Sequence, residues 1–165
     1  MLTMINNFFT ENIFSIASEK DLIAAFRLRD QKKLLLPPGL SFPLNIRSYF
    51  TWAEPSGVYT YLVYKNPTWD LPRGIAFKRF DRTGESTGRL CGWCHSYGSA
   101  DEVSMLSVAM NANTSATYIL CQNLRCIEKI EETAALSGRH PEKWIDQLYH
   151  RINLFFEGIF NYNQD

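Results

Sequence analysis

The sequence predicts an α+β fold in which helices flank a set of antiparallel strands. Apolar residues recur at helical spacing near the N-terminus and in the C-terminal third. The middle of the chain is instead rich in aromatic and β-branched residues separated by turn signals. The chain has 165 residues, of which 45% are hydrophobic and 14% aromatic. This composition is sufficient for a packed core and argues against a disordered protein.

The first predicted element is a helix over residues 18–35. Ser18 is placed to cap it, and Asp21 at the third helical position gives an acidic variant of the capping box. The helix ends at the Pro37-Pro38-Gly39 segment, because proline cannot continue the hydrogen-bond ladder. Its apolar stripe consists of Leu22, Ile23, Ala25 and Phe26.

Strands are predicted in the middle of the chain and helices at its end. Residues 54–57 have turn chemistry and join the first two strands as a hairpin, whereas residues 83–88 are predicted to be a flexible loop. A helix over 122–136 is followed by Gly138 as a capping signal, and Pro141 suits the first position of the last helix. The strands are expected at residues 46–52, 58–65, 74–80, 103–110 and 116–120. The last helix should bury Trp144, Leu148, Ile152, Phe156 and Ile159.

These elements predict two parts, an N-terminal helical extension over residues 1–40 and a main α+β domain over residues 41–165. The chain carries 17 basic and 17 acidic residues. Residues 1–90 have a balance of +4 and residues 91–165 a balance of −4. A neutral chain is a poor candidate for non-specific nucleic-acid binding, so the charge favours a protein-binding or small catalytic domain. We see no membrane span and no secretory leader, and we expect a cytoplasmic protein without a membrane partner.

The four cysteines form two pairs whose spacing predicts a structural zinc site. Cys91 and Cys94 form a C-x2-C turn, in which two sulfurs converge on one ion. Cys121 and Cys126 would lie roughly 140° apart on a continuous helix and could not share an ion there. If Cys121 instead ends a strand and Asn123 caps the helix, Cys126 falls at the third helical position and turns back toward it. The C-x2-C turn of residues 91–94, called the knuckle below, is then followed by a hairpin and by ligands at the start of a helix. This order is the arrangement of a treble-clef zinc finger.

Two other interpretations of the cysteines stay open. The run from Cys91 to His95 matches the C-x-x-C-H pattern of c-type haem attachment, although that pattern normally belongs to exported proteins and leaves Cys121 and Cys126 unexplained. The C-x-x-C pair also fits a redox-active dithiol. Zinc explains all four residues, and a four-thiolate site has no open position for substrate.

The sequence gives no pattern for a catalytic site. It contains three histidines and no G-x-S-x-G, H-E-x-x-H or P-loop motif. We therefore expect no catalytic residues, no small-molecule substrate and no enzyme activity. Trp93, which lies in the knuckle, is the aromatic residue expected to be exposed as an anchor for a partner.

Several segments resemble one family. The pieces are Trp52-Ala53-Glu54-Pro55, Tyr61, Arg73-Gly74-Ile75, the run from Cys91 to His95, and the run from Thr117 to Cys126. Together they resemble the C-terminal treble-clef zinc-finger domain of elongation-factor-G-binding proteins, the FusB-type fusidic-acid-resistance proteins and their chromosomal relatives. The resemblance covers roughly residues 45–160.

The resemblance implies a Zn²⁺ held by Cys91, Cys94, Cys121 and Cys126, and a protein that binds elongation factor G and helps it to leave a stalled ribosome. Candidate contact residues are Trp93, Tyr97, Arg125 and Lys129. The main alternative is an RNA- or ribosome-binding zinc finger that meets phosphates through Arg89, Arg125 and a basic cluster at Arg27, Arg29, Lys32 and Lys33. A redox-sensing dithiol protein is the third possibility.

Overall fold

A computed structural model describes residues 12–80 and 88–162 of the chain. It confirms the predicted α+β class with antiparallel strands. The chain divides into two compact units, Met1–Lys78 and Arg79–Asp165, and each is described by itself. The predicted loop 83–88 lies outside the described residues except for Gly88.

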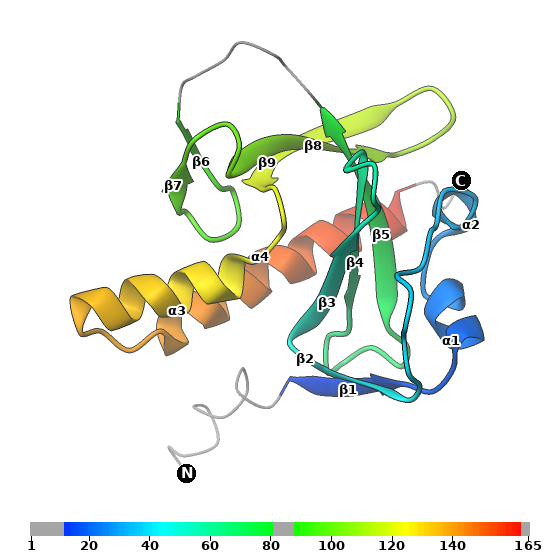
Figure 1. The fold of residues 1–165 in the computed structure, drawn as a ribbon, viewed down its shortest axis with the longest axis horizontal. Helices are drawn as coiled ribbons and strands as arrows, with labels where there is room; N and C mark the ends of the chain where they lie inside the picture. Colours follow the sequence, from blue (N-terminus) through cyan, green and yellow to red (C-terminus); the bar gives the residue numbers. More distant parts are fainter. Residues whose placement is uncertain (1–11, 81–87, 163–165) are drawn as a thin grey trace. The chain divides into compact units, whose positions relative to one another are not determined.

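The first unit is built from two sets of antiparallel strands (Figure 1). β1 (Ile13–Ile16), which the sequence did not predict, pairs with β2 (Leu44–Arg47). β3 (Tyr49–Ala53) and β4 (Tyr59–Tyr64) form the predicted hairpin, and β5 (Arg73–Phe80) pairs with β4 as the predicted third strand. The predicted strand 46–52 is in fact two strands, because Ser48 has a positive φ of 73° between β2 and β3.

The core of the first unit is aromatic. Trp52 and Tyr61 are directly opposite on β3 and β4, and the Phe26 ring meets both edge-on. Their polar atoms bind the backbone of the segment before β2, because buried donors need partners. The Tyr61 hydroxyl donates to Lys33 O at 2.7 Å, and Trp52 Nε1 donates to Leu35 O at 2.8 Å.

The predicted helix 18–35 was wrong in its length. The structure has α1 (Glu19–Ala24) and α2 (Leu28–Gln31) instead. Ser18 caps α1 as predicted, since its hydroxyl accepts from Asp21 N at 3.2 Å. The helix breaks at Arg27, whose backbone is extended because Phe26 is drawn into the core and bridges to Gly74 of β5.

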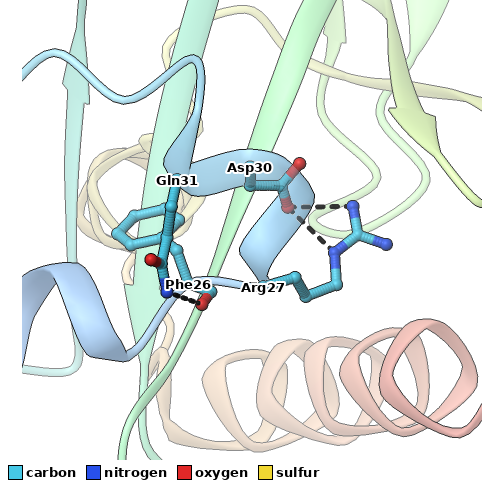
Figure 2. Close-up of polar contacts among 4 residues, drawn as sticks. All are labelled: Phe26, Arg27, Asp30 and Gln31. Atoms are coloured by element: carbon cyan, nitrogen blue, oxygen red, sulfur yellow. Dashed lines mark hydrogen bonds and ion pairs between the residues drawn. The ribbon is translucent and has the colours of Figure 1, made fainter.

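Side chains of α2 stabilise this break (Figure 2). Gln31 Nε2 donates to the Phe26 carbonyl at 2.9 Å. Arg27 Nε donates to Asp30 Oδ2 at 2.9 Å, and the Asp30 side chain is only 1% exposed. Arg27 is therefore committed to a buried ion pair rather than to a basic surface.

The second unit contains two hairpins followed by two helices (Figure 1). β6 (Arg89–Leu90) pairs with β7 (Tyr97–Gly98), and β8 (Val103–Ala109) pairs with β9 (Ser115–Cys121). The β8–β9 hairpin matches the two strands predicted there. β6 and β7 were not predicted, because two-residue strands leave no alternating pattern.

The helices are α3 (Cys126–Ser137) and α4 (Glu142–Asn161). α3 begins four residues later than predicted, and Gly138 ends it in the left-handed conformation as expected. The apolar face of α4 buries Leu148, Ile152, Phe156 and Ile159 as predicted, whereas Trp144 is only half-buried. No helix in the described ranges is long and apolar enough to cross a membrane.

Candidate metal centre

The four cysteine sulfurs come together in the second unit. All four lie within 4.8 Å of one another. Cys91 Sγ is 3.8 Å from Cys126 Sγ, and Cys94 Sγ is 3.5 Å from Cys121 Sγ. A tetrahedron with Zn–S bonds of ~2.3 Å has edges of ~3.8 Å, so the sulfurs already have the spacing that one zinc ion requires. The cysteines are free, and these distances exclude a disulfide bond of ~2.05 Å.

The first cysteine pair lies in the tight loop between β6 and β7. Cys91 N donates to Ser96 O and His95 N donates to Cys91 O, each at 2.9 Å, which closes the loop. Trp93 N points at Cys91 Sγ from 3.4 Å and supports negative charge on that sulfur. His95 takes the left-handed conformation with a φ of 59°, and this bend turns Cys94 back toward the other ligands.

The second pair joins the end of a strand to the start of a helix. Cys121 is the last residue of β9, as predicted, and Cys126 is the first residue of α3 rather than the third. Asn123 does not cap the helix, because its Oδ1 accepts from Arg125 N at 3.0 Å within the preceding turn. Leu124 has a φ of 58° and its N donates to Cys121 O at 2.9 Å, which reverses the chain between the two ligands.

Hydrogen bonds join the two ligand loops. Gly92 N donates to Ile119 O at 2.8 Å, and Cys121 N lies 3.4 Å from Cys91 Sγ. A Cβ on Gly92 would lie 3.3 Å from Ile119 O, so the knuckle approaches β9 closely through a residue without a side chain. Backbone contacts thus set the distance between the two pairs of sulfurs.

The electrostatics of the four-cysteine cluster favour a bound cation. Cys91, Cys121 and Cys126 are fully buried, and Cys94 is partly exposed. Hydrogen bonds from Cys121 and Cys126 hold the pKa of the Cys94 thiol well below its usual range. Hydrogen bonds with Cys121, Cys91 and Cys94, and then burial, raise the pKa of the Cys126 thiol. Four adjacent sulfurs cannot all ionise unless a cation neutralises them, and a divalent ion that prefers thiolates fits this set.

A family profile described as the FBP C-terminal treble-clef zinc-finger matches residues 20–159. The chain belongs to this family. A comparison with curated proteins gave no match. Together with the sulfur cluster, the family establishes a zinc-binding protein of the treble-clef type, in which Cys91, Cys94, Cys121 and Cys126 are placed to hold the ion. The zinc finger of this FBP-family chain lies entirely within its second unit.

The exposure predicted for Trp93 is wrong. Its side chain is 4% exposed, and its ring meets the Phe155 ring edge-on with centroids 5.2 Å apart. Arg151 Nη1 also donates to Trp93 O at 2.7 Å. The knuckle therefore packs against α4, and burying the large indole there removes apolar surface from water. Trp93 is an internal support of the zinc finger rather than a free anchor.

The other candidate contact residues lie at the surface to different degrees. Tyr97 in β7 is 74% exposed, whereas Lys129 is only partly exposed. Arg125 lies before α3 and is mostly exposed, 3.7 Å from Glu128. Burial alone would lower the pKa of Lys129. The nearby Cys121 and Cys94 sulfurs and the Glu102 carboxylate have the larger, opposite effect, so the pKa of Lys129 is raised. Lys129 thus offsets charge at the metal centre.

A cavity of about 460 Å³ adjoins the knuckle. Its lining includes Cys94 and His95 from the knuckle loop, Tyr97 from β7, Thr133 from α3, and Trp144 and Arg151 from α4. Sequence reasoning did not single out Arg151 or Phe155. Phe155 lies on the apolar face of α4 and was detectable as a core residue, but no local pattern connects Arg151 with the knuckle 58 residues earlier.

Proposed function

We propose that this protein binds elongation factor G through its zinc finger and helps the factor to leave stalled ribosomes. The observation that carries this proposal is the match of a treble-clef zinc-finger family to residues 20–159, joined to the resemblance of the cysteine segments to elongation-factor-G-binding proteins. By the same resemblance we propose a cytoplasmic protein that protects translation from fusidic-acid-type antibiotics.

A binding role without catalysis also agrees with the chemistry of the centre. Four thiolates fill the tetrahedral coordination of zinc, so the ion has no open position for water or substrate. Its contribution is to fold the loops around it. We propose that the ion holds a rigid surface against the factor and that the protein is not an enzyme.

Tyr97 and Arg125 are the contact candidates that the fold leaves accessible. Tyr97 projects from β7 next to the knuckle with most of its ring exposed. Tyrosine and arginine are enriched among residues that dominate binding energies at protein interfaces. Trp93 contributes indirectly, because its burial against Phe155 keeps the knuckle in place.

The basic cluster that would support RNA binding through phosphate contacts is smaller in the structure than the sequence indicates. Arg27, a member of the proposed basic cluster, is held by the buried carboxylate of Asp30. The remaining cations of that cluster lie in the first unit, whereas Arg89 and Arg125 lie in the second. RNA binding would weaken steeply with added salt, so titrations at two salt concentrations separate the two functions.

The test is calorimetric titration of the zinc-loaded full chain with purified elongation factor G. Tyr97→Ala should weaken binding about tenfold or more, as expected for an interface residue of this type. Leu71→Ala is a matched control, because Leu71 is also 74% exposed but lies in the first unit. Absence of binding by the wild-type chain would refute the proposed function. Equal losses in both variants would refute only the assignment of the surface.

A further inference from the structure

We propose that Cys94 is a site of oxidation by hydroperoxides, and that its oxidation ends in a disulfide with Cys121 that releases the zinc. The inference rests on the zinc centre and is independent of elongation factor G. It concerns the one ligand of the four that is not buried.

Access to the centre is unequal among its four sulfurs. The residues Cys91, Cys121 and Cys126 have no exposed surface, whereas Cys94 is partly exposed and lines the cavity of about 460 Å³ beside the knuckle. Cys91 Sγ is further covered by backbone N–H groups of Trp93 and Cys121, each at 3.4 Å. A cavity of this volume admits a small organic molecule, so an oxidant that enters it meets Cys94 first.

The surroundings of Cys94 favour attack on a peroxide. Among the residues that the structure describes, the cavity lining includes no carboxylate, whereas Arg151 and His95 are part of it. A positive group nearby stabilises the oxygen anion that leaves when a peroxide bond breaks. Oxidation of cysteine follows thiolate character and exposure, and Cys94 combines the two as an accessible zinc ligand.

The position of Cys121 determines the product. Its sulfur lies 3.5 Å from Cys94 Sγ, at the end of β9, and is shielded from direct attack by burial. Cys121 is therefore suited to react second, with an oxidised Cys94, rather than first with the oxidant. The resulting bond would connect the knuckle to the second ligand loop, whereas a bond within the C-x2-C turn would join Cys94 to Cys91.

The chemistry proceeds in two steps. The Cys94 thiolate attacks a hydroperoxide oxygen, so an S–O bond forms, the O–O bond breaks, and an alkoxide leaves and takes a proton from water. Sulfur loses two electrons and the peroxide gains them. The Cys121 thiolate then attacks the sulfenic sulfur, an S–S bond forms, and hydroxide leaves. Two of the four ligands are consumed, and Cys91 and Cys126 alone cannot retain the ion.

The experiment exposes the zinc-loaded full chain to limiting tert-butyl hydroperoxide. Free zinc is followed with a chromophoric chelator, and the disulfides are identified by peptide mass spectrometry after alkylation. We expect zinc release to parallel the appearance of a Cys94–Cys121 cross-linked peptide. A first product that joins Cys91 to Cys94, or one that involves Cys126, would overturn the proposal, as would full retention of zinc and free thiols.

A cavity-filling variant tests the route without removing a ligand. Thr133 lines the cavity from an exposed position on α3, so Thr133→Trp should slow zinc release about fivefold or more while leaving the zinc content unchanged, because access to the thiolate is reduced. Glu132→Trp is the matched control, since Glu132 is the exposed neighbouring residue on α3 and is not part of the cavity lining. Release from Thr133→Trp at the wild-type rate would refute entry through this cavity.

Discussion

Tyr61 is expected to make the protein sensitive to alkaline pH. Its side chain is fully buried, and its hydroxyl donates to Lys33 O. Burial, followed by the nearby negative charge of Glu54, raises the pKa of Tyr61 to about 12 from a usual value of 10.0. Because the folded state holds this proton more tightly than the unfolded state, the stability contribution is complete below pH 10 and is lost as the pH rises toward 12.

The magnitude follows from the shift. Each pKa unit corresponds to about 1.4 kcal/mol, so the full difference of two units amounts to about 2.7 kcal/mol, of which about half is lost by pH 11. Tyr61→Phe cannot ionise there but loses the hydrogen bond to Lys33 O, which costs about 1 kcal/mol at neutral pH. The variant should therefore be less stable than wild type at pH 8 and more stable above roughly pH 11.

Urea unfolding curves of the zinc-loaded protein at pH 8, 9, 10, 11 and about 11.5 would measure this crossover. The two proteins differ only at position 61, so the difference between their free energies of unfolding isolates the contribution of Tyr61. Phe26→Leu is a suitable control, because it lowers stability in the same core without removing a titrating group. A constant difference between wild type and Tyr61→Phe over this pH range would refute the reasoning.

Four further predictions concern stability and the metal. Removing zinc with a strong chelator should unfold the second unit, because binding contributes on the order of 10–16 kcal/mol in small zinc domains; a circular dichroism spectrum that does not change would contradict this. Trp93→Ala should lower the free energy of unfolding in urea by about 3–5 kcal/mol, because it leaves a cavity where the indole packs against Phe155. A loss below about 1 kcal/mol would contradict this packing. Gly74→Ala should cost about 1–3 kcal/mol, since its Cβ would lie 2.8 Å from the buried Phe26 ring, and combining it with Phe26→Leu should recover part of the loss if that contact is the cause. His95→Gly should raise the thermal midpoint by an amount equivalent to about 1 kcal/mol, because glycine takes the left-handed conformation without strain; a lower midpoint would show that the His95 side chain has a stabilising contact.

The structure also explains which sequence predictions were accurate. The β3–β4 and β8–β9 hairpins were predictable because strand residues and turn residues alternate over short distances, and antiparallel neighbours pair locally. The first helix was predicted too long, because its apolar stripe fits a continuous helix as well as two short ones. What breaks it is the packing of Phe26 against Gly74, a residue 48 positions later.

The sequence by itself determined the chemistry of this protein: four cysteines in two pairs, spaced so that a knuckle and a strand-to-helix turn bring their sulfurs onto one zinc ion. Ligand identity and spacing are local properties of the chain, and the loops at Cys91 and Cys126 follow from them. Only the tertiary structure decided how accessible each group is. The packing of α4 buries Trp93, and the cavity beside the knuckle leaves Cys94 as the accessible ligand. Accessibility depends on which distant segments cover a side chain, and no local pattern in the sequence contains that information.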